Sequence, residues 1–343
     1  MTVRIAFLGT PDVAVPPLRA LLARDDVEVV VVVTNPDRPR GRSRTPKPPP
    51  VKVAAEEAGV EVLQPEKPSE VVDRLRELEL DAGAVVAYGA LLRQDLLDST
   101  AHGFVNLHYS LLPRWRGAAP VQHALMAGDE VTGVSTFVLD PGMDTGPLLL
   151  VEEVQVGLDE SAGDLLERLT DVGAPLLGDA VVGLVDGSLT PRPQDEQGAT
   201  LAPKITPEDT LVDWSAPAAR VRDLLRGADP RPGAHSIWRG ERVKLFRSEV
   251  LDAADLEAAG PDGGAGSAPD TGSDTGSGTG SGTEAIADAA PGTVVAVHAE
   301  GPVVACGEGL LRLTELQPAG KPRREGRDFV NGERPEPGER FGS

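Results

Sequence analysis

Residues 105–148 read VNLHYSLLPRWRGAAPVQHALMAGDEVTGVSTFVLDPGMDTGPL, and this stretch decides both the fold class and the site. An apolar run over 103–108 predicts a β-strand, residues 120–127 predict a helix, and residues 133–139 predict a second strand. This order of strand, helix and strand is typical of an α/β domain.

The polar residues of the stretch predict an active site. Asn106 and His108 are two residues apart, so in a strand both side chains leave the same face. Asp144 follows the next strand on a glycine-flanked turn and can approach the same place. An amide, an imidazole and a carboxylate suit a reaction in which one substrate attacks another.

The same alternation of short strands and helices extends over the first 189 residues. Strands are predicted at 3–8, 27–33, 82–87, 103–108, 133–139 and 148–156, and helices near 18–23, 51–58, 70–78, 94–98, 120–127 and 162–185. Val-rich strands that alternate with helices predict an α/β domain with a mostly parallel sheet that is covered on both faces. Ligands of such sheets bind at the carboxyl ends of the strands.

The second half of the chain predicts a separate domain. We expect a catalytic domain at 1–189, a linker rich in Pro, Gly and charge at 190–209, and a C-terminal domain at 210–343. One helix near 216–226 and strands near 242–250, 292–298, 302–306 and 310–316 predict a small β-barrel, although a sandwich has the same pattern. A low-complexity insertion at about 260–290 cannot contribute a core.

Composition limits the class of protein. The chain has 343 residues, 40% hydrophobic and 25% charged, which is typical of a globular protein. Its single cysteine, Cys306, excludes a disulfide framework and a cysteine-based zinc site. We find no signal peptide and no membrane-spanning run, so we expect a cytoplasmic protein without a membrane partner. We see no exposed apolar seam in the pattern, which favours a monomer.

The charge distribution is uneven. The formal net charge is −21, which alone argues against nucleic acid as a partner. Eight acids and no Lys or Arg lie between Asp252 and Ala290, whereas residues 35–52 carry six cations against Asp37. That basic stretch predicts phosphate contacts, and its alternative is a solvated loop.

Several motifs together resemble the formyltransferase family that uses 10-formyltetrahydrofolate. They are Arg4-Ile-Ala-Phe-Leu-Gly-Thr-Pro-Asp12, Pro36-Asp-Arg-Pro39, Val86-Ala-Tyr-Gly89, Asn106-x-His108-x-Ser110-Leu-Leu-Pro113, Arg116-Gly117-Ala118-Ala119-Pro120, Asp144-Thr145-Gly146 and Leu316-Gln-Pro-Ala-Gly-Lys321. The resemblance covers nearly the whole chain except the insertion. Tyr109 departs from it, because members often have glycine there.

The resemblance implies roles for particular residues. Asn106 and protonated His108 stabilise the oxygen of the formyl group, Asp144 keeps His108 charged and relays a proton, and no metal takes part. It also implies that the folate pocket is lined by Ser110, Leu111, Leu112 and Pro113. The resemblance further implies a doubly wound, mostly parallel, Rossmann-like sheet in the first domain and an OB-like β-barrel in the second.

Within the family, the chain is most similar to members that formylate the α-amino group of methionine on the initiator tRNA for translation initiation. The resemblance therefore implies tRNA contacts by Arg38, Arg40, Arg42, Arg44 and Lys47. Three alternatives stay open at this point. They are a formyltransferase for an amino sugar nucleotide or another small amine, a hydrolase that cleaves the formyl group, and a non-catalytic RNA-binding protein.

Overall fold

The computed structural model describes residues 2–39, 45–251 and 289–342. Its contacts divide the chain into two units. The first unit consists of Met1–Ala124, Asp129–Leu158 and Gly163–Lys204, and the second of Leu125–Gly128, Asp159–Ala162 and Ile205–Ser343. The predicted insertion at about 260–290 lies almost entirely outside the described residues.

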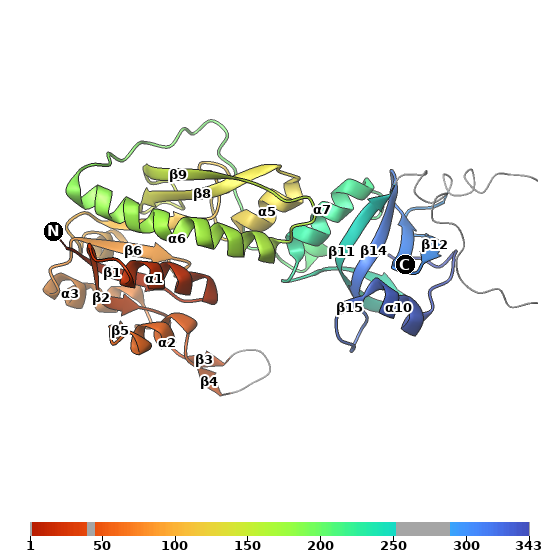
Figure 1. Ribbon diagram of the computed structural model, residues 1–343, viewed down its shortest axis with the longest axis horizontal. Coiled ribbons are helices and arrows are strands. Elements are labelled where there is room, and N and C mark those ends of the chain that lie inside the picture. The colour runs from red at the N-terminus through yellow and green to blue at the C-terminus, as the bar shows by residue number, and fades with distance from the viewer. Residues whose placement is uncertain (1, 40–44, 252–288, 343) are drawn as a thin grey trace, which may run out of the picture. The chain divides into compact units, whose positions relative to one another are not determined.

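A mixed but mostly parallel sheet is the centre of the first unit (Figure 1). Among the described residues its order is β5-β2-β1-β6-β7-β8-β9. Strand β8 runs antiparallel to both β7 and β9, and the other neighbouring strands are parallel. The strands are β1 (Val3–Gly9), β2 (Val27–Val33), β5 (Glu61–Leu63), β6 (Ala82–Val86), β7 (Phe104–His108), β8 (Val131–Val138) and β9 (Leu148–Gln155). This confirms the predicted fold class of the first half of the chain.

Helices cover the sheet, and each lies within a few residues of its predicted range. They are α1 (Val15–Leu22), α2 (Pro50–Glu57), α3 (Val72–Glu77), α4 (Gln94–Leu97), α5 (Pro120–Ala127) and α6 (Ala162–Asp186). Two of them, α1 and α2, begin with proline in the first turn, where its missing N–H costs nothing.

The two faces of the sheet are covered by different helices. On one face, Leu8 of β1 and Val33 of β2 pack with Leu75 of α3 and Leu96 of α4 in one buried cluster. On the other face α1 and α6 lie side by side (Figure 1), and Arg24, just after α1, pairs with Asp179 of α6 at 2.7 Å. A sheet buried on both sides explains why β2 reads VEVVVVV.

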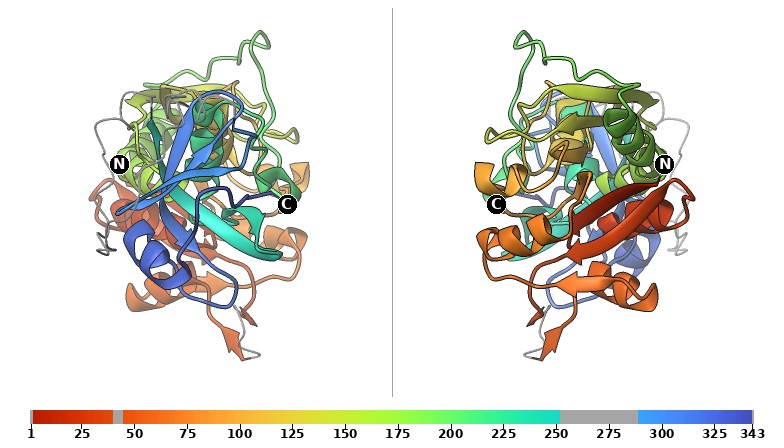
Figure 2. Two further views of the ribbon diagram at one scale, coloured as in Figure 1. Left: turned by 90° about the vertical axis from the view of Figure 1, so that its right-hand side faces the viewer. Right: turned by 90° about the vertical axis from the view of Figure 1, so that its left-hand side faces the viewer.

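A short basic hairpin extends from the first unit. Its strands are β3 (Arg38–Pro39) and β4 (Pro46–Lys47), and the three views show them standing away from the sheet (Figures 1 and 2). Residues 40–44 between them are outside the described part of the chain.

The segment that we predicted as a linker shows an extended course along the first unit. Arg192 exchanges two backbone hydrogen bonds with Leu148, of 2.7 and 2.8 Å, and Ala202 donates to the carbonyl of Arg116 at 2.7 Å. The contact boundary falls between Lys204 and Ile205, inside the predicted linker of 190–209. The division at 1–189, 190–209 and 210–343 stays a prediction.

The second unit contains an antiparallel sheet in the order β10-β11-β14-β13-β12, with β15 paired to β14. Its described elements are α7 (Ala218–Ala228), β10 (Ala234–Trp238), β11 (Glu241–Leu251), β12 (Val294–His298), β13 (Gly301–Ala305), β14 (Leu310–Gln317), β15 (Arg324–Glu325) and α10 (Gly326–Glu333). The sequence analysis missed β10, β15 and α10.

The end of the chain closes this sheet into a barrel. Gly342 donates its N–H to the Ile237 carbonyl in β10 at 2.7 Å, and Val294 at the start of β12 donates to the Glu339 carbonyl at 2.8 Å. Residues 339–342 therefore lie between the two outer strands. Trp214, Trp238 and Phe341 are buried in its core. The predicted small β-barrel is thus confirmed over the sandwich, because a sandwich would leave both edges open.

Candidate active site

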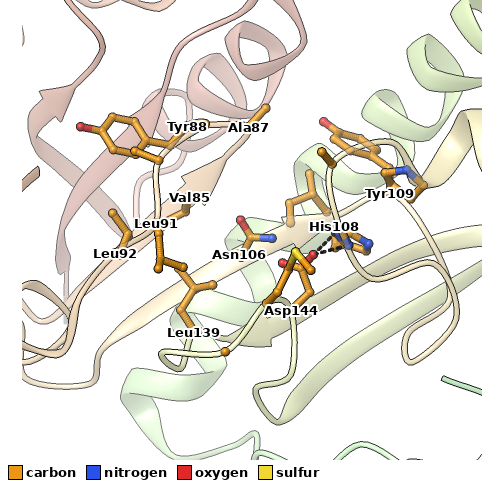
Figure 3. Close-up of a pocket in the computed structure, with 18 of the residues that line it drawn as sticks. Val85, Ala87, Tyr88, Leu91, Leu92, Asn106, His108, Tyr109, Leu139 and Asp144 are labelled. Carbon is orange, nitrogen blue, oxygen red and sulfur yellow. Dashed lines mark hydrogen bonds and ion pairs between the residues drawn. The ribbon is translucent and has the colours of Figure 1, made fainter. Parts of the chain in front are cut away.

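Strand β7 carries the first two residues of the site. It lies between β6 and β8, with Asn106 opposite Val85 on one side and opposite Phe137 on the other. The Asn106 and His108 side chains leave the same face of this strand, and Figure 3 shows both beside Asp144 at the cavity. The structure thus brings the three predicted catalytic residues together.

One ring nitrogen of His108 is held by a hydrogen bond, and the other faces Asp144. Nε2 lies 2.9 Å from the Trp115 carbonyl oxygen, which can only accept, so Nε2 carries a hydrogen. Nδ1 lies 3.6 Å from Oδ2 of Asp144. Nδ1 is therefore the ring atom available to a substrate.

The charge state of His108 depends on two opposing effects. Burial lowers the pKa of His108 below its usual value, whereas the Asp144 carboxylate and the hydrogen bond to Trp115 raise it. The effect of burial is larger. This direction favours a neutral resting imidazole, whereas the resemblance implied a protonated His108.

Asp144 occupies a tight turn after β8. Its φ is +55°, a left-handed conformation that Asp tolerates better than most residues. Its Oδ2 accepts a hydrogen bond of 2.8 Å from the N–H of Gly117. Gly146 follows in the same turn and must be glycine, because a Cβ there would lie 1.8 Å from the Val138 carbonyl oxygen. The Asp-Thr-Gly motif therefore has a steric reason as well as a chemical one.

A cavity of about 460 Å³ opens beside these three residues. Val85, Leu92 and Leu139 contribute apolar lining, and the turns 87–91 and 139–144 surround it (Figure 3). Ala87 and Gly89 have φ of +47° and +81°, so the first turn is tightly folded around the cavity. A volume of this size with apolar walls and a few polar groups is typical of a small-molecule site.

The predicted folate residues Ser110, Leu111, Leu112 and Pro113 do not line this cavity. Ser110 is fully buried and donates its hydroxyl to the Arg114 carbonyl at 2.6 Å. Ser135 of β8 binds this loop twice, to the Ser110 carbonyl at 2.7 Å and the Leu112 N–H at 3.1 Å. In the structure these residues support the loop that leads to Trp115, and their contact with folate stays a prediction.

The predicted tRNA residues fall on the basic hairpin. Arg38 and Lys47 are exposed and face each other in register across β3 and β4. Arg38 lies 3.9 Å from Glu66, a loose and exposed ion pair. Arg40, Arg42 and Arg44 lie outside the described residues, so RNA binding by all five stays a prediction.

The sequence analysis missed several residues that hold the site. Gln194 and Thr200 lie in the predicted linker, where polar residues carry no periodic signal, yet both bond to the loops around His108.

Within the described ranges, no group of three or more His, Cys, Asp or Glu residues could hold a metal. Over the same ranges, no helix has both the length and the apolar character needed to cross a membrane.

The fold and the site define a class of enzyme that transfers formyl groups. Residues 3–181 match the family described as Formyl transferase, and residues 204–334 match Formyl transferase, C-terminal domain. The chain belongs to the formyl transferase family.

Its sequence relatives include methionyl-tRNA formyltransferases. The chain is 46% identical to that of Streptomyces griseus subsp. griseus and 44% identical to that of Thermobifida fusca, each over 342 residues and 99% of both chains. It is 54% identical to that of Streptomyces coelicolor over 256 residues, which are 74% of this chain and 83% of that protein.

Solved structures share the fold at low identity. An N-formyltransferase from Helicobacter canadensis, in complex with folinic acid and dTDP-3-aminofucose, superposes with a TM-score of 0.62 at 13% identity, over 92% of this chain and 100% of that one. HypX from Aquifex aeolicus in complex with tetrahydrofolic acid gives a TM-score of 0.59 at 17% identity, over 97% of this chain and 47% of that one. These likenesses show the fold.

Proposed function

We propose that this protein transfers the formyl group of 10-formyltetrahydrofolate to the α-amino group of methionine on the initiator tRNA. The relatives that match it over nearly their full length are named methionyl-tRNA formyltransferases, which supports this reaction. The observation that carries the proposal is the meeting of Asn106, His108 and Asp144 at one end of the cavity. These groups can stabilise an oxyanion and move a proton without forming a covalent bond to the substrate.

The cavity suits a folate. Its volume of about 460 Å³ accommodates a flat bicyclic ring and the start of its side chain. Leu92 and Leu139 offer apolar contact to the ring faces, and the turns 87–91 and 139–144 bring backbone groups to its polar edge. The bound folate supplies the reactive formyl carbon. We propose that Ser110, Leu111, Leu112 and Pro113 shape this site through the loop that they support.

Each of the three side chains has one task in the proposed mechanism. Asn106 donates its amide N–H to the formyl oxygen, where negative charge develops as the amine attacks. His108 accepts the proton of the attacking amine at Nδ1 and delivers it to N10 of the folate as the C–N bond breaks. Asp144 stabilises the imidazolium that exists between these two transfers. A single well-placed donor to such an oxygen contributes on the order of 3 kcal/mol.

The resting charge of His108 fits this role. A proton acceptor must be neutral before it acts, and burial lowers the pKa of His108. Asp144 lies close enough to favour the charged ring once the proton arrives. In this mechanism His108 is an imidazolium only between the two proton transfers.

Two observations support tRNA as the acceptor substrate, namely the names of the relatives and the basic hairpin. We propose that Arg38, Arg40, Arg42, Arg44 and Lys47 contact tRNA phosphates. The exposure of Arg38 and Lys47 supports this, because exposed cationic side chains can reach phosphate groups. We propose that it acts in the cytoplasm, where charged tRNA is used, and that it acts as a monomer.

A formyl-transfer assay tests the function. Purified protein is given 10-formyltetrahydrofolate with charged initiator tRNA, charged elongator tRNA, or amino sugar nucleotides, and the formylated product is measured. We expect product with the initiator tRNA alone. Product with an amino sugar only would overturn the proposed acceptor, and formate release without an amine would instead support a hydrolase.

A further inference from the structure

One amide side chain, that of Gln194, joins the two loops that hold His108. Its Nε2 donates to the carbonyl oxygens of Asp144 and Gly146, both at 2.8 Å. Its Oε1 accepts from Arg116, from Nε at 3.0 Å and from Nη2 at 2.7 Å. Gln194 therefore links the Asp144 turn to the loop that follows Trp115.

The chemistry of this position requires an amide. The two N–H groups and the two lone pairs of Gln194 are all used, so its hydrogen-bonding capacity is complete. A glutamate in its place keeps the acceptor for Arg116 but offers no donor to the two carbonyl oxygens. A methionine keeps the approximate shape and loses all four hydrogen bonds.

The two joined loops are those that contact the ring of His108. The carbonyl of Trp115, next to Arg116, accepts from Nε2, and Asp144 faces Nδ1 at 3.6 Å. Gly117, on the other side of Arg116, donates to the Asp144 carboxylate at 2.8 Å. Gln194 thus bonds directly to the backbone of Asp144, which faces Nδ1, and to Arg116, which is next to the Trp115 partner of Nε2.

The backbone around Gln194 is anchored at the same two places. Arg192 is paired with Leu148, just beyond the Asp144 turn. Thr200 accepts the Trp115 N–H at its hydroxyl at 2.9 Å and the Arg116 N–H at its carbonyl at 2.9 Å. The segment 192–202 therefore spans from one loop to the other, and Gln194 is half-buried between them.

We propose that Gln194 is a positioning residue for catalysis, which sets the distance and orientation between His108 and Asp144 without touching the reacting atoms. This inference rests on the proposed function, since it assigns Gln194 to the same proton-transfer pair. Residues that orient metal ligands through hydrogen bonds typically change activity by about 10–100-fold when removed, and we expect a loss of the same order here.

The test is a double-mutant cycle measured by formyl transfer to charged initiator tRNA. Gln194→Met is expected to lower kcat by about 10–100-fold, with KM for tRNA and for folate changed less than about threefold. In an Asp144→Asn background the same substitution is expected to lower kcat less than about threefold, because residues that act through one another are not additive. A general structural role would give the same loss in both backgrounds.

Two further variants sharpen the test. Gln194→Glu retains the Arg116 contact, and we expect it to lose as much kcat as Gln194→Met because it lacks donors for the Asp144 turn. It also serves if Gln194→Met fails to fold, as judged by circular dichroism. Gln197→Met, an exposed glutamine of the same segment, is the matched control and should stay within about twofold of the parent.

The outcomes separate this inference from the proposed function. A parent protein without formyl transfer to any charged tRNA removes the proposed function. An active parent with near-normal kcat in Gln194→Met or Gln194→Glu overturns the inference alone. Additive losses in the Asp144→Asn background also overturn it.

Discussion

The role of Asp144 makes the most direct prediction about the chemistry. Asp144→Asn keeps the size of the side chain and an oxygen that can accept the Gly117 N–H, and it removes one negative charge. The distance from Nδ1 of His108 to Oδ2 of Asp144 is 3.6 Å. Two unit charges near this separation attract by about 4 kcal/mol at an effective dielectric constant of about 20.

That attraction acts only while His108 is charged, which in the proposed mechanism is between the two proton transfers. Since about 1.4 kcal/mol corresponds to a tenfold change in rate, the substitution is expected to lower kcat by about 10³-fold. KM for either substrate should change little, because neither ground state uses the imidazolium. The assay is steady-state formylation of charged initiator tRNA at saturating folate.

The pH dependence gives a second measurement on the same variant. His108 must be neutral to accept a proton, so kcat is lost as the pH falls through its pKa. Burial places the midpoint of this acid limb below the usual histidine value of about 6.5. Asp144 raises the pKa against burial, so Asp144→Asn should move the midpoint to still lower pH.

Asp73→Asn is the control, because it removes the same charge from a side chain that is 94% exposed. We expect its kcat to match the parent. A loss below about tenfold in Asp144→Asn, or an acid limb that moves to higher pH, would refute the proposed role of Asp144.

Three further predictions concern other parts of the first unit. Asn106→Ala should lower kcat by about 10²-fold with little change in KM, since it removes one donor to the developing oxyanion. Gly117→Ala should lower the free energy of unfolding, by at least about 2 kcal/mol in urea denaturation, because φ is +128° and the new Cβ would lie 2.6 Å from the Ala202 carbonyl oxygen. Gly198→Ala, with φ of +83° and open space around it, should cost only about 1 kcal/mol, and equal losses would contradict the steric argument. Arg38→Ala should raise KM for tRNA and reduce the slope of log affinity against log salt by about 1, while an unchanged slope would remove its phosphate contact.

Most strands and helices of the first unit were predictable because their signals are local, whereas β5 and the two strands of the basic hairpin were missed. The run VEVVVVV in β2 is apolar except for the exposed Glu28, as is typical of a strand that is covered on both faces. Proline in the first turn of α1 and of α2 is a further local signal, typical of the start of a helix. The elements that the analysis missed are short, as in β15, or depend on packing, as in α10, whose Phe329 is buried in the barrel core.

The candidate site was predictable in part. Asn106 and His108 share a face by the period of a strand alone, and Asp144 was found through its glycine-flanked turn. The charge of His108 was not predictable, because it depends on how completely neighbours from other elements bury the ring. Ser110 is a similar case, since its hydrogen bond to Arg114 turns it into the loop and away from the cavity.

The amino-acid sequence by itself determined the α/β class, the β-rich second half and the identity of the three polar residues, because periodicity and short motifs are local properties of the chain. Only the tertiary structure decided that the stretch 192–202 crosses both active-site loops, and that Gln194 holds them together. It also decided that residues 339–342 close the barrel. These contacts join residues far apart in the sequence through single hydrogen bonds, which leave no periodic pattern to read.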